Sequence, residues 1–192
     1  MNENVKILKT ELLSDNWYKL DKVTFEFINK NGEKEIHKRE VYDRGNGATI
    51  LLYNTGKRKI ILTKQFRLPS YLNGNKDGLL IETCAGLLDE DNPEECIKRE
   101  AIEETGYKIT NVKKIFETYM SPGAVTEILH FFIAEYNEKM KVSEGGGLDA
   151  EQEQIEVLEF DFNEAYNMIA TGEIKDAKTI MLLQYAKINE LL

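Results

Sequence analysis

The sequence has few of the residues that usually build metal clusters or covalent cross-links. Its 192 residues include only two cysteines and two histidines. Cys84 and Cys96 lack the spacing of a metal-binding pair, and His37 and His130 have no partner nearby in the sequence. Disulfides persist mainly in oxidising compartments, so we expect two reduced thiols and a cytoplasmic protein.

Long apolar runs and an excess of positive charge are also missing. The first residues, M-N-E-N-V-K-I-L-K-T-E, contain no apolar signal core, and no later run approaches the length of a membrane-spanning helix. The formal net charge of −9 argues against a general binder of nucleic acid or membrane surfaces. We therefore expect a soluble protein that has neither nucleic acid nor membrane as its partner.

The order of the predicted elements indicates an α/β (α+β) chain with an N-terminal β arm. A length of 192 residues fits one domain with a small additional arm. Residues 5–43 read as strands, and Asn31-Gly32 is a strong hairpin signal. We therefore expect an antiparallel arm over 1–45 and a main domain over 46–192. In the main domain the pattern predicts strands at 48–54, 59–66, 78–84, 112–120, 127–136 and 155–160, a polar loop around Pro69, and closing helices near 162–171 and 176–190.

The clearest element is a helix that begins after Asn92. Asn92 is a good N-cap, Pro93 suits the first helical position, and Gly106 is a typical C-terminal stop. Four residues are predicted to face the core: Cys96, Ile97, Ala101 and Ile102. With this helix between the strands, we expect a mixed sheet sandwiched between helices.

Another side of this helix carries Glu100, Glu103 and Glu104. Like charges three or four residues apart repel each other, and clustered carboxylates suit Mg²⁺ or Mn²⁺. A solvated acidic face is the alternative. Two features favour the cation site: Arg99 stands directly before Glu100, and we expect a tight turn at Ala85-Gly86 whose carbonyl can reach the same cation.

The stretch from Arg99 to Tyr107, R-E-A-I-E-E-T-G-Y, resembles the diagnostic half of the Nudix box, G-x5-E-x7-R-E-U-x-E-E-x-G-U, where U is aliphatic. Counted back from Arg99, Asp91 replaces the first Glu of the box, and Ala85, followed by Gly86, replaces its first Gly. The downstream stretch Ser121-Pro122-Gly123 and the residue Glu127 resemble the nucleoside diphosphate sugar branch of the Nudix hydrolases. This resemblance covers nearly the whole chain.

The resemblance implies a Nudix fold and a hydrolase that depends on Mg²⁺, with Mn²⁺ as the alternative metal. The expected reaction is cleavage of the diphosphate of a nucleoside diphosphate sugar, with GDP-mannose giving GMP and mannose 1-phosphate. ADP-ribose is the alternative substrate. A sensor that binds a nucleotide sugar without hydrolysing it is a further alternative, but that reading predicts a degraded box.

The resemblance also assigns roles to residues. The implied metal ligands are the Ala85 carbonyl, Glu100, Glu104 and Glu153. Glu151 is the alternative to Glu153. The acidic loop that carries both residues differs in length from the corresponding loop of the related Nudix enzymes, so the alignment does not choose between them. Glu103 is an additional ligand, either directly or through water, and the general base is Glu127 or Glu153.

The implied substrate contacts come from both parts of the chain. They are Trp17, Lys38, Arg39, Glu40, Arg67, Ala85, Gly86, Leu87, Glu104, Glu127, Glu153 and Lys178. Arg67 is the candidate clamp for the diphosphate, because a guanidinium binds phosphate oxygens in pairs. Trp17 or Tyr42 is the candidate for stacking on a purine. In related enzymes the N-terminal strands exchange between two subunits, so we expect a homodimer.

Overall fold

The computed structural model describes residues 4–88, 92–148, 150 and 152–192. The chain divides into two compact units, one formed by residues 1–46 and 118–129 and the other by residues 47–117 and 130–192. The division at residue 45 predicted from the sequence did not include the segment 118–129. The predicted boundary between an arm over 1–45 and a main domain over 46–192 stays a prediction.

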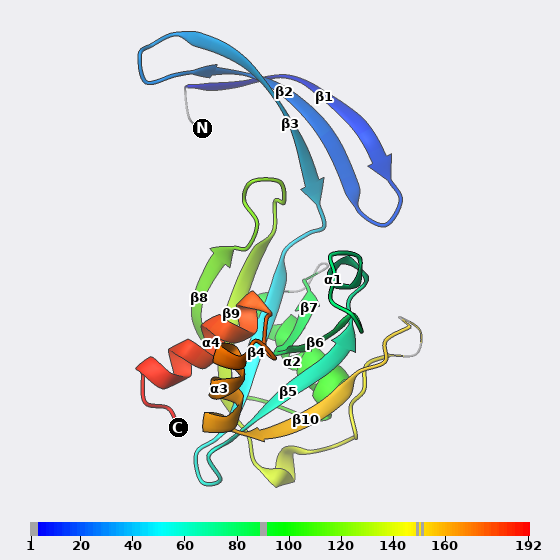
Figure 1. The fold of residues 1–192 in the computed structure, drawn as a ribbon, viewed down its shortest axis with the longest axis vertical. Helices are drawn as coiled ribbons and strands as arrows, with labels where there is room; N and C mark the ends of the chain where they lie inside the picture. Colours follow the sequence, from blue (N-terminus) through cyan, green and yellow to red (C-terminus); the bar gives the residue numbers. More distant parts are fainter. Residues whose placement is uncertain (1–3, 89–91, 149, 151) are drawn as a thin grey trace. The chain divides into compact units, whose positions relative to one another are not determined.

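The first unit contains a three-stranded antiparallel sheet. Its strands are β1 (Val5–Asp15), β2 (Lys19–Ile28) and β3 (Lys34–Asp43), drawn in blue in Figure 1. Gly32 has a φ of 82° at the β2–β3 turn, a left-handed conformation that glycine adopts without strain. The hairpin predicted at Asn31-Gly32 is therefore confirmed.

The segment 118–129 joins this unit through the end of β3. The Tyr42 amide donates to the Ala124 carbonyl at 2.8 Å, and the Thr126 amide donates to the Tyr42 carbonyl at 3.1 Å. The Thr126 hydroxyl also donates to Asp43 Oδ1 at 2.9 Å. The Ser121-Pro122-Gly123 stretch thus lies in a segment that is hydrogen-bonded to the end of β3.

The second unit is built on a seven-stranded mixed sheet. The strands follow the order β10-β5-β4-β9-β8, while β6 pairs with β5 and β7 pairs with β4. Their bounds are β4 Gly47–Asn54, β5 Lys59–Phe66, β6 Leu79–Glu82, β7 Cys84–Leu87, β8 Lys113–Tyr119, β9 Ile128–Glu135 and β10 Glu156–Asp161. Five of the six strands predicted for the main domain are present, and the sixth, predicted over 78–84, is divided into β6 and β7.

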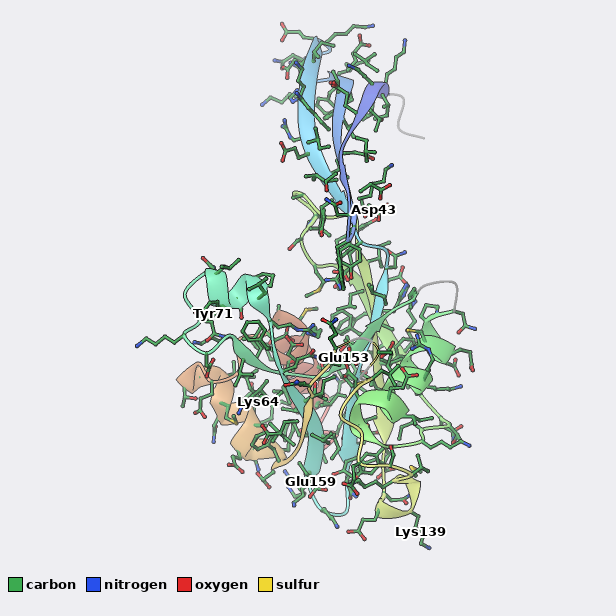
Figure 2. All side chains as sticks on the ribbon, turned by 90° about the vertical axis from the view of Figure 1, so that its right-hand side faces the viewer. Asp43, Lys64, Tyr71, Lys139, Glu153 and Glu159 are labelled. Carbon is green, nitrogen blue, oxygen red and sulfur yellow. The ribbon has the colours of Figure 1, made fainter. Side chains whose placement is uncertain are left out.

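Helices cover both faces of this sheet, as Figures 1 and 2 show. Helix α2 (Pro93–Thr105) packs against β4, β5 and β7, whereas α3 (Phe162–Thr171) contacts β10 and α4 (Ala177–Ile188) contacts β4. A short 3-10 helix, η1 (Glu138–Met140), precedes the acidic loop. The predicted sheet between helices is confirmed. No helix in the part of the chain that the structure describes has the length and apolar character needed to span a membrane.

Four local predictions need correction. A short helix, α1 (Leu68–Leu72), occupies the segment predicted as a polar loop, with Pro69 in its first turn. Ala85 and Gly86 lie in β7 opposite Thr49 and Ala48, and do not form a turn. The chain changes its pairing from β5 to β4 at Thr83, which replaces one predicted strand by two short ones. Ile102 is half-buried, so the core face of α2 is narrower than predicted.

Candidate active site

Helix α2 begins and ends where the sequence predicts. The Asn92 side chain accepts hydrogen bonds from the amides of Glu94 and Glu95, at 3.1 and 3.0 Å. Gly106 ends the helix with a φ of 79°. The core face of α2 consists of Cys96, Ile97 and Ala101, all of them fully buried. With the helix fixed in this rotation, Glu104 points toward β7 and is itself buried.

Glu104 is a carboxylate almost without contact with solvent. Its side chain is 1% exposed, and the Ala85 amide donates to its Oε2 at 3.3 Å. Burial raises the pKa of Glu104 to about 8, and repulsion from Glu100 and Glu153 adds to this, while Cys84 and Arg67 oppose it. Glu100, Glu104 and Glu153 are therefore electrostatically coupled, and a cation between them would remove this repulsion.

Glu100 packs directly on the backbone of β7. A Cβ on Gly86 would overlap the carboxyl group and Cγ of Glu100, so a side chain at residue 86 cannot coexist with this position of Glu100. Arg99 Nη1 lies 3.0 Å from Glu100 Oε1 and 2.9 Å from Glu103 Oε2. Although burial opposes it, the pKa of Arg99 is raised by these two carboxylates. Arg99 thus holds Glu100 and Glu103 in place.

A glycine-rich loop brings Glu153 to the same helix. The Gly146 amide donates to the Glu104 carbonyl at 2.9 Å, and the Gly147 amide donates to the Glu103 carbonyl at 3.0 Å. These carbonyls belong to the last turn of α2, where carbonyls lack partners within the helix. Beyond the glycines, the Leu148 amide donates to Glu153 Oε2 at 3.2 Å. The loop therefore caps α2 and fixes the Glu153 carboxylate.

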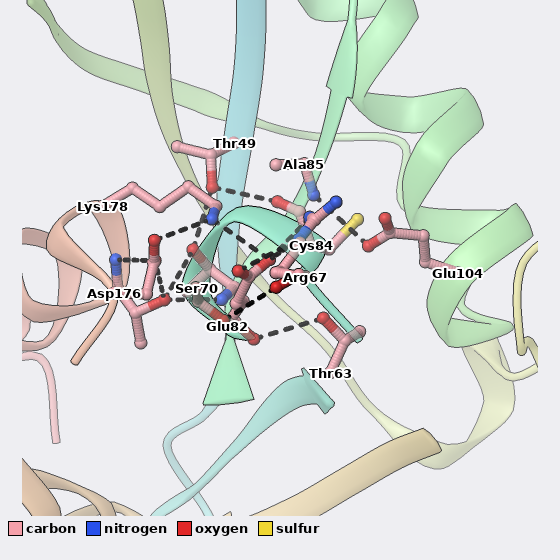
Figure 3. Close-up of polar contacts among 12 residues, drawn as sticks. Thr49, Thr63, Arg67, Ser70, Glu82, Cys84, Ala85, Glu104, Asp176 and Lys178 are labelled. Atoms are coloured by element: carbon pink, nitrogen blue, oxygen red, sulfur yellow. Dashed lines mark hydrogen bonds and ion pairs between the residues drawn. The ribbon is translucent and has the colours of Figure 1, made fainter. Parts of the chain in front are cut away.

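Two predicted cationic contacts of the substrate meet on a residue that sequence reasoning missed. Arg67 and Lys178 both form ion pairs with Glu82, at the end of β6 (Figure 3). The sequence signal was a carboxylate that closes an otherwise apolar strand, G-L-L-I-E. Cys84, which interacts with Glu104 by a hydrogen bond, was also missed as part of the site.

Other predicted site residues lie in the first unit. Trp17 is 83% exposed and meets Tyr18 edge to face, with ring centroids 6.2 Å apart. Lys38, Arg39 and Glu40 lie on β3. Arg44 Nε lies 3.7 Å from Glu127 Oε1 within this unit. The roles predicted for these residues in substrate binding and base catalysis stay predictions.

The donor set fits a hard divalent cation. Such an ion prefers carboxylate and carbonyl oxygens, and Mg²⁺ usually keeps several waters beside one or two carboxylates. Glu100 and Glu104 supply two carboxylates on one side of α2. Within the described ranges no group of three or more acidic, histidine or cysteine side chains is placed to hold a metal ion. The Ala85 contact with Glu104 is made by its amide, so the carbonyl ligand stays a prediction, and Asp91 and Glu151 lie outside the described residues.

A family model described as the NUDIX domain matches residues 43–183, nearly three quarters of the chain. The chain belongs to the Nudix family. A second model, described as the GDP-mannose pyrophosphatase NudK N-terminal domain, matches residues 4–42 of this Nudix protein. Nudix hydrolases generally need a divalent metal, which agrees with the carboxylate pair on α2.

The Nudix protein is also similar to curated proteins over its whole length. It is 60% identical to the GDP-mannose pyrophosphatase of Yersinia enterocolitica serotype O:8 / biotype 1B. It is 55% identical to the proteins of the same name from Salmonella typhimurium and Shigella flexneri serotype 5b. Each match covers 100% of this chain and 100% of the relative, so it includes both the N-terminal residues and the Nudix domain.

Proposed function

We propose that this Nudix protein hydrolyses GDP-mannose to GMP and mannose 1-phosphate with Mg²⁺ as its metal. The observation that carries this proposal is the full-length match to proteins named GDP-mannose pyrophosphatase, at up to 60% identity. The intact R-E-A-I-E-E segment, Arg99 to Glu104, supports hydrolysis over a non-catalytic sensor. The buried position of Glu104 beside β7 supports a metal site on α2.

In this proposal the diphosphate of the substrate binds between two groups: a metal ion that carboxylates hold, and the cationic side chains of the chain. Glu100, Glu104 and Glu153 would hold the metal with the Ala85 carbonyl, and Arg67 and Lys178 would bind phosphate oxygens. A bound divalent cation lowers the pKa of a coordinated water and neutralises charge on phosphate oxygens. Arg99 keeps the Glu100 carboxylate oriented, and a general base, Glu127 or Glu153, removes a proton from the attacking water.

We infer a homodimer in which the N-terminal sheet of one subunit completes the pocket of the other, with contacts from Trp17, Lys38, Arg39 and Glu40. The exposed apolar side chains on this sheet support an interface there. Two free, buried cysteines support a cytoplasmic location.

A substrate panel tests the function. GDP-mannose, ADP-ribose and ADP-glucose are incubated with the protein in Mg²⁺, in Mn²⁺ and in EDTA, and the products are separated by chromatography. We expect GMP and mannose 1-phosphate only with metal, and GDP-mannose as the substrate with the highest kcat/KM. Higher kcat/KM with ADP-ribose would overturn the substrate, and tight binding of GDP-mannose without turnover would favour the sensor.

A pair of substitutions on α2 tests the metal site. Glu100→Gln should lower kcat by about 100-fold or more, because a metal ion contributes several kcal/mol to transition-state stabilisation. Glu95→Gln is the matched control, since Glu95 lies on the same helix, is exposed and pairs with Lys98. A fully active Glu100→Gln variant would contradict the assignment.

A second pair distinguishes the two candidate bases. Glu127→Gln and Glu153→Gln are compared by the pH dependence of kcat/KM and by the affinity for Mn²⁺. The base variant should lose the acidic limb of the profile. Weaker Mn²⁺ binding in Glu153→Gln alone would make Glu153 a metal ligand and leave Glu127 as the base.

A further inference from the structure

Two cationic side chains from distant parts of the chain converge on one carboxylate oxygen. Arg67, which follows β5, places Nη2 at 2.7 Å from Glu82 Oε2, and its Nε lies 3.2 Å from both oxygens of Glu82. Lys178, in the first turn of α4, places Nζ at 3.3 Å from the same Oε2. Figure 3 shows the two side chains meeting at Glu82 beside β6.

Glu82 is buried, so its carboxylate needs the two cationic side chains as partners. The Glu82 side chain is 3% exposed, and a buried carboxylate without cationic partners is strongly unfavourable. A second carboxylate, Asp176, pairs with Lys178 Nζ at 3.0 Å through Oδ1. The other oxygen of Asp176 accepts from the Thr179 amide and hydroxyl, at 2.9 and 2.6 Å, and so caps α4. Two carboxylates therefore fix the Lys178 ammonium between β6 and the start of α4.

The guanidinium of Arg67 is anchored by one edge only. Its side chain is 40% exposed although Glu82 is nearly inaccessible, and its hydrogen bonds to Glu82 use Nε and Nη2, not Nη1. Burial lowers the pKa of Arg67, but Glu82 raises it more, and the charge of Glu104 adds to that increase. Arg67 thus lies close enough to Glu104 for the two charges to interact, with the remaining edge of its guanidinium available to an anion.

We propose that Glu82 is a positioning residue that docks Arg67 and Lys178 together, as a preformed two-cation site for the substrate phosphates beside the carboxylates of α2. Glu82 does not contact the substrate. It removes the need to order a long arginine and a long lysine at the moment of binding, which is the benefit of preorganisation. This inference rests on the proposed function, because that function places a diphosphate next to Glu104.

The first experiment separates positioning from a merely structural role. Glu82→Gln keeps the side-chain volume but removes the charge, and should raise KM by roughly 10- to 100-fold, the effect of losing one charge-assisted contact. The change in kcat should be much smaller, because the loss affects substrate and transition state alike. Glu82→Asp keeps the charge and should recover part of the loss. Mn²⁺ affinity should not change in either variant.

The control is Glu156→Gln, which removes an exposed carboxylate that lies 3.5 Å from Lys64 on the neighbouring strand. Its KM should equal that of the wild type. A Glu82→Gln variant that melts at a lower temperature but keeps the wild-type KM would overturn the proposal. So would a Glu82→Asp variant with the same KM as Glu82→Gln.

The second experiment uses guanidinium chloride at low millimolar concentration as a probe of the docking site. Arg67→Ala should bind guanidinium on Glu82, which would raise the melting temperature above that in matched NaCl and restore part of the lost turnover. The double variant Arg67→Ala with Glu82→Gln should show neither effect. A guanidinium effect of equal size in the double variant, or none in Arg67→Ala, would overturn the proposal.

The melting readout is independent of the substrate. If the wild-type protein hydrolyses no member of the panel, the proposed function has failed. Stabilisation by guanidinium that requires Glu82 would then still support the docking of Arg67 on Glu82. If guanidinium neither stabilises Arg67→Ala nor restores its turnover, the role of Glu82 itself is refuted.

Discussion

The Glu100 side chain occupies the space in which a Cβ on Gly86 would lie. The contact joins α2 to β7, and the Glu100 carboxylate must leave this position if residue 86 gains a side chain. Gly86 has no unusual backbone conformation, so its small size is the property that the structure uses.

Gly86→Ala should therefore displace Glu100 and impair metal binding while the fold persists. We expect weaker Mn²⁺ binding and a loss of kcat/KM of about 10- to 100-fold, as for other changes that disturb metal-site geometry. Isothermal titration with Mn²⁺ and steady-state kinetics measure the two effects. Gly56→Ala is the control, since a Cβ there would meet only Asn54 Oδ1 at 3.5 Å. Wild-type Mn²⁺ affinity in Gly86→Ala would contradict the prediction.

The raised pKa of Glu104 predicts how the metal-free protein responds to pH. Its pKa is about 8 in the folded state against an ordinary value of 4.5 for a solvated glutamate, so between these values the folded state binds more protons than the unfolded state. Stability in EDTA should therefore fall as pH rises from about 4.5 to about 8, by up to roughly 5 kcal/mol from this group. Chemical unfolding at several pH values measures the slope.

Glu104→Gln is the test of that assignment, because glutamine cannot titrate. In EDTA at pH 8 the variant should be more stable than the wild type, while it loses Mn²⁺ binding and turnover. Added Mn²⁺ should raise the stability of the wild type and not that of the variant. A wild-type pH slope in Glu104→Gln would show that another group is responsible.

A comparison of alanine substitutions at two neighbouring glycines separates the effect of moving Glu153 from the effect of backbone strain in the loop. Gly146 and Gly147 have φ values of 108° and 83°, so alanine is strained at both. A Cβ at Gly147 would lie 2.5 Å from Glu153 Oε2, whereas one at Gly146 would meet only the Ile155 carbonyl oxygen at 3.7 Å. Both variants should lose about 1 kcal/mol or more of stability. Only Gly147→Ala should also lose at least about tenfold in kcat/KM.

The proposed dimer predicts a mass of twice 22.1 kDa in solution, measurable by light scattering. Several apolar side chains of the N-terminal unit are exposed: Ile7, Leu12 and Ile36 on its strands, and Trp17 between β1 and β2. Leu12→Glu should shift the equilibrium toward monomer and lower kcat/KM at low protein concentration. Lys30→Glu, in the exposed β2–β3 turn, is the control. A monomeric wild-type protein with full activity would refute the exchange of N-terminal strands.

Local signals predicted the elements of the fold well. The signals that locate α2 are local in the sequence: the N-cap Asn92, the C-terminal Gly106 and the spacing of its apolar residues. The sequence alone therefore predicted this helix and its acidic face. The turn predicted at Ala85-Gly86 was wrong because a glycine is also needed where a side chain approaches a strand, and that reason is visible only once Glu100 is in place.

The contacts between distant residues could not be predicted in this way. Glu82 meets Arg67, which follows β5, and Lys178 from α4, and no periodicity connects these three positions. The resemblance to the Nudix family supplied Arg67 and Lys178 as separate substrate contacts, but not the buried carboxylate that holds them together. Likewise, the docking of Gly146 and Gly147 on α2 depends on backbone amides, which carry no sequence signal of their own.

The hydrogen bonds from Gly146 and Gly147 to the last turn of α2 have a consequence for local unfolding. The helix end cannot fray without releasing the loop, so the two segments should open as one cooperative unit and their amides should exchange with deuterium at a common rate. We expect insertions within residues 143–147 to break this unit, because they displace the amides that bond to α2. We expect insertions between Gly147 and Glu153 to be tolerated better, because they lie beyond these two amides.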